Sequence, residues 1–445
     1  VSSMTVLTVV AAPLLPTNID FTPDVGRDST RVTITGQGFI NVREVRFGGV
    51  AVRNFTVENA GRIIAIISTG ATGTVSVSTT TGTATSQRIF RYITPLQADS
   101  LVLVGFYRAT NGNRWTTSNN WLSSLPIQFW SGVGIQNGRV TSLNLPYNAV
   151  NGSLTGAIVQ LSALSALQTL NLSGNGLAGE LPATIGAMRS LRNLSMSNVG
   201  LSGTLPREIA LLDSLETLRL DSNSISGSLE EALCMLGNVS SRESSRLREV
   251  RLNNNRMTGQ VPSCIVEFRQ LTNIHLQNNF FSGGIPERIV ELTRLKELVL
   301  ANNRLSGTLP RSFDRAFAVK AAQVTAFQTL ERLDIAQNSM TGAIPTGITQ
   351  FSALRELRFN DNRFSGDFPQ TFPALLRLEI FDASRNALTG TLPENIGLMR
   401  QLRQFSVSRN QMSGAIPTGL AECELLRRLE LDSNNFEGTL PEGVS

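Results

Sequence analysis

The sequence predicts a mainly β protein with short 3-10 or α segments, in which a β-sandwich precedes a solenoid of stacked repeats. Three observations carry this prediction. After about residue 140 one pattern returns every 24 residues. Residues 13–94 hold short alternating runs separated by Gly and Pro. All three tryptophans lie between these two regions. A chain of 445 residues also exceeds one ordinary domain.

The repeat can be recognised by comparing consecutive copies of the motif. With x for any residue, one copy reads Leu298-x-Leu300-x-x-Asn303-x-Leu305-x-Gly307-x-Leu309-Pro310. Its asparagine recurs at Asn148, Asn175, Asn223, Asn255, Asn279, Asn303, Asn338, Asn362, Asn386, Asn410 and Asn434. Val199 stands in that column where an asparagine is expected. Self-similarity at a fixed period of this length predicts a solenoid whose units are stable only against their neighbours.

Each part of the repeat has a physical role. In Leu-x-Leu, alternate residues of a short strand point into the coil and the x positions face outward. An asparagine at each strand end can donate and accept at once, so stacked asparagines satisfy backbone groups that the turn leaves unpaired. In Gly-x-Leu-Pro, glycine accommodates a tight turn and proline ends a strand.

The segment Leu-Ser-Gly-x-Leu/Ile-Pro resembles the leucine-rich repeat of the plant-receptor subtype over about 300 residues. The resemblance implies a right-handed solenoid with a parallel sheet on its inner face. We expect it to cover residues 140–445, with about 12 coils and an incomplete C-terminal end. Family members mostly bind proteins, peptides or glycans, or serve as scaffolds.

Residues 95–139 are expected to cap the first coil. The phrase Trp130-Ser-Gly-Val, followed by Gly138-Arg-Val-Thr-Ser-Leu-Asn-Leu145, is similar to the N-terminal cap of this repeat family. The plant version carries a cysteine pair, and this segment has no cysteine. The tryptophan cluster is interpreted as cap core, with a sugar-binding platform as the alternative.

Residues 13–94 include the phrases Val32-Thr-Ile-Thr-Gly-Gln-Gly-Phe39 and Val45-Arg-Phe-Gly-Gly49. With these phrases, residues 13–94 resemble an IPT/TIG immunoglobulin-like domain. In surface proteins such domains act mainly as spacers or adhesive units. Residues 1–12 parallel the last strand of this module, so we interpret them as the final strand of a preceding copy. The chain is therefore expected to be a piece of a larger protein.

Two coils are longer than the others, and the cysteines lie close to one of them. The first insert, at residues 237–246, is polar, and the second, at 313–327, reads as a helix. Cys234 and Cys264 fall in the outer segments of adjacent coils, so we predict a disulfide between them. Cys423 takes a leucine position and is expected to be a buried free thiol.

The sequence offers no catalytic motif. Its single histidine, His275, is expected on the outward face of a strand as a surface polar residue. We find no nucleophile elbow, P-loop or HExxH pattern, and no cysteine spacing suited to zinc. We therefore expect no enzyme activity, no cofactor and no metal site. The 37 arginines (39 basic residues less two lysines) are spread among acids, which argues against nucleic-acid binding. No apolar run is long enough to span a membrane.

The leading interpretation is that the inner sheet of an extracellular or cell-surface protein binds a protein, peptide or glycan. The outward positions expected to form this site are Arg219, Asp221, Arg251, Asn253, His275, Gln277, Asp334, Arg358, Asp361 and Asp382. Arginine offers a planar fork for carboxylate, sulfate or phosphate groups, and the carboxylates of Asp334 and Asp382 would orient the partner. The alternative is a structural subunit of an extracellular filament, appendage or sheath, which assembles with itself or with other surface proteins.

Five sequons make the protein a candidate glycoprotein. They start at Asn54, Asn151, Asn171, Asn193 and Asn238. Asn238 lies in the polar insert and is the favoured position if the source is eukaryotic.

Overall fold

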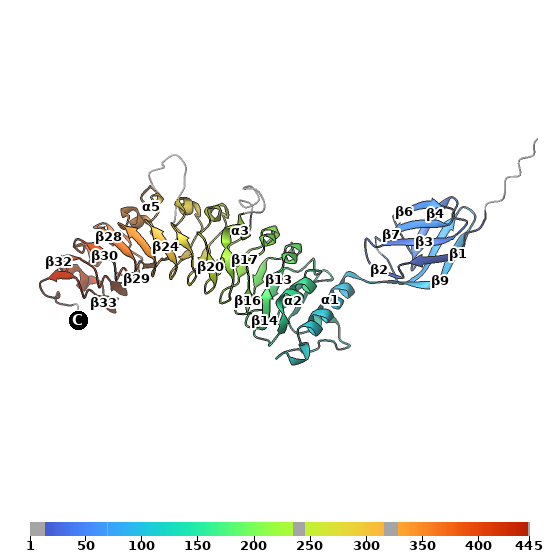
Figure 1. The fold of residues 1–445 in the computed structure, drawn as a ribbon, viewed down its shortest axis with the longest axis horizontal. Helices are drawn as coiled ribbons and strands as arrows, with labels where there is room; N and C mark the ends of the chain where they lie inside the picture. Colours follow the sequence, from blue (N-terminus) through green and yellow to red (C-terminus); the bar gives the residue numbers. More distant parts are fainter. Residues whose placement is uncertain (1–13, 69, 235–244, 316–327, 444–445) are drawn as a thin grey trace, which may run out of the picture. The chain divides into compact units, whose positions relative to one another are not determined.

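A computed structural model describes residues 14–68, 70–234, 245–315 and 328–443 (Figure 1). The chain forms two compact units. The first runs to Leu101 and includes Asn137–Arg139, and the second holds the remainder from Val102 onward. The strand expected within residues 1–12 and the candidate glycosylation position Asn238 lie outside the described residues.

Two β-sheets make up the described part of the first unit before the cap. One has the strand order β1-β3-β7-β6 and the other β2-β9-β8-β4-β5. All neighbours are antiparallel except β2 and β9, which are parallel. The strands are β1 (Thr17–Thr22), β2 (Val25–Gly26), β3 (Arg31–Gln37), β4 (Val42–Phe47), β5 (Val50–Ala51), β6 (Asn54–Asn59), β7 (Arg62–Ile66), β8 (Gly73–Thr79) and β9 (Thr83–Tyr92).

One core lies between these sheets. Val32 and Ile34 on β3 are fully buried and alternate with more exposed neighbours, as the period of a strand requires. From the other sheet, Phe47 and Phe90 meet edge to face with ring centroids 4.8 Å apart. The unit is thus a two-layer β-structure, and its immunoglobulin-like identity remains a prediction.

The cap segment contains a helix that the sequence patterns did not suggest. The helix α1 (Pro95–Ala109) precedes η1 (Gly112–Arg114) and η2 (Ile127–Phe129). Trp115, Trp121 and Trp130 are each at most 7% exposed. Their rings pack in series, with centroids 4.9 and 5.0 Å apart. The three indoles therefore form a buried core in the cap segment. None of the three exposes a ring face on which a sugar could stack.

The solenoid has a long inner sheet of 13 strands in the described chain, ordered by coil. From β11 onward the neighbours are parallel, and residues at equivalent positions of adjacent coils pair in register, as Arg219 does with Arg251. The strands are β10 (Val133–Gln136), β11 (Arg139–Asn144), β13 (Thr169–Asn171), β15 (Asn193–Ser195), β17 (Thr217–Arg219), β19 (Glu249–Arg251), β21 (Asn273–His275), β23 (Glu297–Val299), β25 (Arg332–Asp334), β27 (Glu356–Arg358), β29 (Ile380–Asp382), β31 (Gln404–Ser406) and β33 (Arg428–Glu430).

Shorter parallel sheets, here called the flanking sheets, form where each coil turns away from the inner sheet. Their strands are β12 (Asn151–Ser153), β14 (Gly176–Glu180), β16 (Leu201–Ser202), β18 (Ser226–Ser228), β20 (Arg256–Thr258), β22 (Ser282–Gly283), β24 (Arg304–Gly307), β26 (Ser339–Gly342), β28 (Arg363–Asp367), β30 (Ala387–Thr389), β32 (Ser413–Ala415) and β34 (Asn435–Glu437).

The remaining part of each coil is a short helix or 3-10 turn. These elements are α2 (Leu154–Leu161), η3 (Ala183–Ala187), η4 (Arg207–Leu211), α3 (Leu229–Leu233), η5 (Ser263–Glu267), η6 (Glu287–Glu291), α5 (Ser312–Arg315), η7 (Thr346–Gln350), η8 (Phe372–Ala374), η9 (Ile396–Leu398) and η10 (Thr418–Glu422). Of the two inserts, only residues 245–246 and 313–315 belong to the described chain.

The asparagine column ties the inner sheet to the flanking sheets. Asn279 Oδ1 accepts from the Met257 N–H at 2.9 Å, and Nδ2 donates to the carbonyls of Leu252 and Leu276 at 2.9 and 3.1 Å. Met257 lies on β20, whereas the two carbonyls follow inner strands. Asn279 thus satisfies three backbone groups that would otherwise lack a hydrogen-bond partner in the turn.

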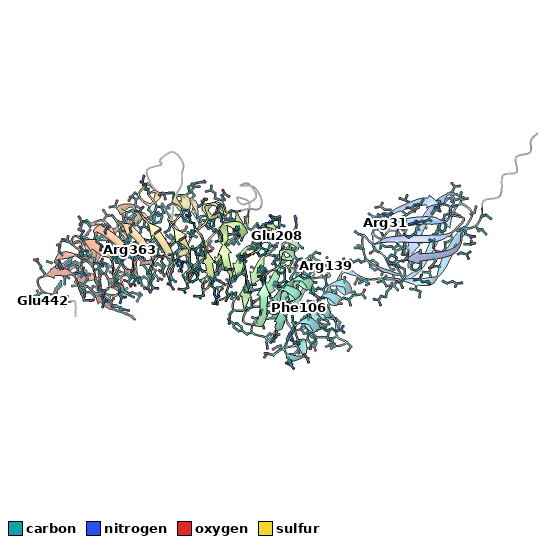
Figure 2. All side chains as sticks on the ribbon, viewed as in Figure 1. Arg31, Phe106, Arg139, Glu208, Arg363 and Glu442 are labelled. Atoms are coloured by element: carbon teal, nitrogen blue, oxygen red, sulfur yellow. A yellow bond between two sulfur atoms is a disulfide. The ribbon has the colours of Figure 1, made fainter. Side chains whose placement is uncertain are left out.

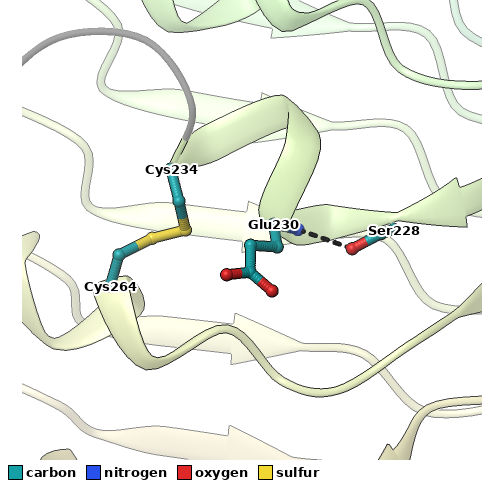
Figure 3. The surroundings of a disulfide bond; sticks show 4 residues. All are labelled: Ser228, Glu230, Cys234 and Cys264. Carbon is teal, nitrogen blue, oxygen red and sulfur yellow. Dashed lines mark hydrogen bonds between the residues drawn. A yellow bond between two sulfur atoms is a disulfide. The ribbon is translucent and has the colours of Figure 1, made fainter.

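Two of the three cysteines form a disulfide, and the third is a free thiol. Cys234, at the end of α3, is bonded to Cys264 in the next coil, with their Cα atoms 5.9 Å apart (Figure 3). The bond closes the chain around the polar insert. Cys423 is buried and free, and its Sγ lies 3.6 Å from the Ile396 carbonyl oxygen. Burial raises the pKa of the Cys423 thiol, so the group stays protonated and packs as a small apolar residue.

Candidate ligand-binding face

The outward positions of the inner strands carry mostly polar side chains, and this surface is here called the inner face. Figure 2 draws all the described side chains as sticks. Each inner strand from β13 to β31 has a buried residue at its centre and outward residues on both sides, as in Glu249–Arg251 around Val250. The six strands from β17 to β27 carry four arginines and four carboxylates at outward positions. Formal charge on this stretch is therefore balanced.

At one end of the stretch, Glu249 joins two arginines. Arg219 forks onto it, with Nη2 2.8 Å from Oε2 and Nε 3.2 Å from Oε1. Arg251 Nε also bonds Glu249 Oε1 from the same strand. Burial acts to raise the pKa of Glu249, but the hydrogen bonds and charges of the two arginines outweigh it and hold that pKa below its usual range. Glu249 is therefore ionised at neutral pH and fixes both guanidinium groups.

In the middle of the stretch, His275 is paired with Glu297. His275 Nε2 lies 2.7 Å from Glu297 Oε2, and the residue is only 9% exposed. Burial lowers the pKa of His275, and the positive charges of Arg251 and Arg332 add to this against the opposing pull of Glu297. His275 does face outward, but it is not the surface residue that the sequence suggested, because its neighbours in adjacent coils cover it.

The far end of the stretch holds two further pairs. Arg332 Nη2 lies 3.0 Å from Asp334 Oδ2, and Asp334 is buried to 6% exposure. Arg358 Nε lies 2.5 Å from Glu356 Oε1. All four arginines of the stretch are thus held by carboxylates.

The other expected site residues occupy varied positions. Asp221 accepts from Ser197 Oγ at 2.6 Å, and Asp382 accepts from the Ser384 N–H and hydroxyl at 3.0 and 2.7 Å. Asn253 is half-buried at the equivalent outward position. Gln277 Oε1 is buried and has no hydrogen-bond partner among the described residues.

Asp361 was wrongly assigned to the face. It lies one position later, in the turn after β27, with φ of 55°. There it accepts from Arg385 Nη1 at 3.2 Å and from Asn360 Nδ2 at 2.8 Å. Asn360 takes the outward position that the sequence interpretation gave to Asp361, because Phe359 is the buried residue before it.

Four charged residues of the face were missed altogether. Glu249, Glu297, Arg332 and Glu356 are the first outward residue of their strands, directly before the buried Leu or Val. The sequence interpretation read only the positions after that residue. Alternation along a strand applies equally on both sides of it, so the signal was present in the pattern.

The candidate glycosylation positions differ in access. Asn54 and Asn151 are exposed. Asn171 and Asn193 are half-buried on inner strands, and Asn171 Nδ2 donates to Asn144 Oδ1 at 2.9 Å. Of these four, Asn54 and Asn151 offer the most accessible amides.

Neither a metal-binding cluster nor a membrane-spanning helix occurs in the described chain. No group of three or more His, Cys, Asp or Glu side chains there is arranged to hold a metal ion. None of its helices combines the length and apolar character needed to cross a bilayer.

Comparison with known proteins bears on the solenoid. A family model described as Leucine Rich Repeat matches residues 166–188, 214–236 and 294–316. These three segments of the solenoid therefore carry recognisable leucine-rich repeats. No curated protein matches the chain.

Solved structures share this leucine-rich-repeat fold. One described as a TDR receptor is 29% identical with a TM-score of 0.60, covering 67% of this chain and 49% of that one. The PEPR1–AtPEP1 structure is 24% identical with a TM-score of 0.54, covering 77% and 53%. A plant ice-binding protein is 24% identical with a TM-score of 0.53, covering 77% and 96%. The chain thus spans about half the length of the first two.

Proposed function

We propose that this chain is a non-enzymatic secreted or cell-surface protein that binds a peptide, protein or glycan through its inner face. The observation that supports this is the prearranged charge ladder between β17 and β27. Carboxylates already hold its arginines in place, so a ligand meets ordered donors and acceptors and little side-chain entropy is lost on binding. Similarity to the TDR receptor structure supports a receptor-like role.

The balance of charge narrows the ligand class. Four arginines and four carboxylates alternate along the stretch, so neither sign dominates. A polymer with one sign of charge would meet as much repulsion as attraction there. A peptide segment, which presents donors and acceptors together, matches the face better. The first unit then serves as a spacer or adhesive module.

The test starts with a displayed-peptide library and a glycan array screened against the full chain. For the ligand so found, we expect Arg219→Ala with Arg251→Ala to weaken binding by about 2–3 kcal/mol, as for central charged contacts, while folding is retained. The control is Arg189→Ala with Arg427→Ala, two exposed arginines outside the inner strands. Equal losses in both variants, or a native complex whose partner contacts only the outer helical segments, would contradict the proposal and favour the structural role.

A further inference from the structure

A second surface of the solenoid carries arginines in a regular pattern. Arg256, Arg304 and Arg363 are the first residues of β20, β24 and β28. Each is exposed, and the residue after it is buried, so the three side chains leave the same side of the flanking sheets. We call this side, from β20 to β28, the flanking face. An arginine occurs there in every second coil.

These arginines have no carboxylate partner in the part of the chain that the structure describes. Within the described ranges, none of Arg256, Arg304 and Arg363 belongs to an ion pair, whereas the four outward arginines on the inner strands from β17 to β27 all do. Arg304 instead lies over the ring of Phe280, 4.5 Å from its centroid. Phe280 stands in the coil between Arg256 and Arg304 and is 40% exposed. The flanking face thus combines uncompensated positive charge with an accessible aromatic ring.

A column of small hydroxyl side chains runs beside the arginines. It lies two residues further along each strand, on the same side of the sheet, and consists of Thr258, Ser282, Ser306, Thr341 and Ser365. The acid at the edge of this column, Asp367, is engaged by Thr389 Oγ1 at 2.7 Å. Hydroxyls both donate and accept, so the column suits a ligand that is itself rich in hydroxyl groups.

The distance between successive arginines on the flanking face indicates which acidic polymer could fit it. Neighbouring strands lie about 4.8 Å apart, so arginines in alternate coils recur about every 10 Å. Nucleic acid strands carry a phosphate about every 3.4 Å along their axis, which is too dense for this pattern. A polysaccharide with one carboxylate on each sugar unit spaces its charges more widely, and alternate units can then meet successive arginines.

We propose that the flanking face binds an acidic polysaccharide with carboxylated sugar units. Arginine forks pair with the carboxylates of alternate units, while Phe280 packs against the apolar side of an intervening sugar ring. The hydroxyl column exchanges hydrogen bonds with the sugar hydroxyls. This site is independent of the ligand proposed for the inner face.

The test uses the full chain and polygalacturonate as the probe, measured by calorimetry at low and moderate salt. Arg256→Ala, Arg304→Ala and Arg363→Ala combined should weaken binding about tenfold or more and flatten its salt dependence, since three exposed charge contacts are lost. The matched control removes the same charge from exposed arginines elsewhere, with Arg189→Ala, Arg377→Ala and Arg427→Ala, and should change binding less than about twofold. Phe280→Ala should weaken binding without altering the salt dependence.

Several outcomes would overturn the proposal. Equal losses in the two triple variants would show that net charge alone is responsible. Equal binding of the fully methyl-esterified polymer would show that its carboxylates are not recognised, and equal binding of polyglutamate would point to an acidic protein. Absence of binding by the unaltered chain at low salt would also refute it. Arg219→Ala with Arg251→Ala should leave polygalacturonate binding unchanged, so this result is read separately from that of the inner face.

Discussion

The inner face and the flanking face come from the same coils, yet they treat arginine in opposite ways. On the inner face, Arg219 and Arg251 share Glu249, and Arg332 and Arg358 are paired with Asp334 and Glu356. On the flanking face, Arg304 stacks on Phe280 beside a column of serines and threonines. One repeat therefore supplies a balanced, ordered surface and a cationic one, and each suits a different class of ligand.

The largest expected effect comes from cutting the asparagine column that joins the two sheets. Asn279→Ala removes the acceptor of the Met257 N–H and the donor to two buried carbonyls. Each buried group left unsatisfied costs about 1–3 kcal/mol, so we expect a loss of about 4 kcal/mol in the free energy of unfolding. Urea denaturation followed by circular dichroism measures it.

Asn278→Gly is the matched control for that prediction. Asn278 is exposed and adopts φ of 58°. Among the described residues its side chain is hydrogen-bonded only to Asn254 and Asn302. Glycine accepts this backbone angle, so the loss should stay below about 1 kcal/mol. Similar losses for the two substitutions would mean that the buried column does not hold the inner and flanking sheets together.

A smaller effect separates backbone conformation from packing in the flanking sheets. Gly307 and Gly342 are equivalent glycines with φ of 81° and 83°. A Cβ on Gly307 would meet nothing within 4 Å, whereas one on Gly342 would lie 2.8 Å from Thr308 Cγ2. Gly307→Ala should cost about 1 kcal/mol through its positive φ, and Gly342→Ala about 2 kcal/mol because the contact is added. Thermal and urea unfolding of both variants check the difference.

Thr308→Ser tests the cause of that difference, because it removes Cγ2 and leaves the hydroxyl. In the background of Gly342→Ala it should recover most of the extra loss, and a double-mutant cycle measures the coupling. A coupling near zero would mean that the coils of the flanking sheets do not approach as closely as the structure has them.

The sequence predicts best what every coil repeats. The buried leucines, the asparagine column and the positive-φ glycines recur at fixed positions, so one copy explains the others. The pairing of charges between coils does not follow from the repeat pattern. Arg219 meets Glu249 across 30 residues, in a coil lengthened by an insert, and no single repeat contains that information. Asp361 was misplaced by one residue for a related reason, since outward and turn positions are both polar.

The cap shows the same limit in another form. Residues 95–109 carry no repeat pattern, and the structure forms α1 there. In its second half, Leu103 and Phe106 are fully buried, and Phe106 lies 5.7 Å from Trp115 between ring centroids. The buried side of this helix packs against an aromatic cluster formed by residues 107–130. Periodicity alone could not identify this helix.

The smallest expected effect is a change of the free energy of unfolding with pH, which depends on the chain's single histidine. This histidine lies on the inner face, so the effect distinguishes the two faces. The pKa of His275 lies below its ordinary value of 6.5 in the folded chain, mainly through burial. As the pH falls through that value, the unfolded chain takes up a proton that the folded chain resists, so stability is lost on acidification. We expect a lower free energy of unfolding at pH 5.5 than at pH 7.5, measured in urea.

His275→Gln keeps a donor near Glu297 and removes the titrating ring, so it should abolish this difference. The carboxylates with lowered pKa values do not interfere, because they take up protons only in more acidic solution; they are Asp20, Glu249, Glu291 and Glu430. The flanking face has no histidine, so its binding of polygalacturonate should not follow the same titration. If the stability difference survives in the variant, His275 is not the group responsible. A shift from pH 7.5 to pH 5.5 would then not serve to distinguish the inner face from the flanking face.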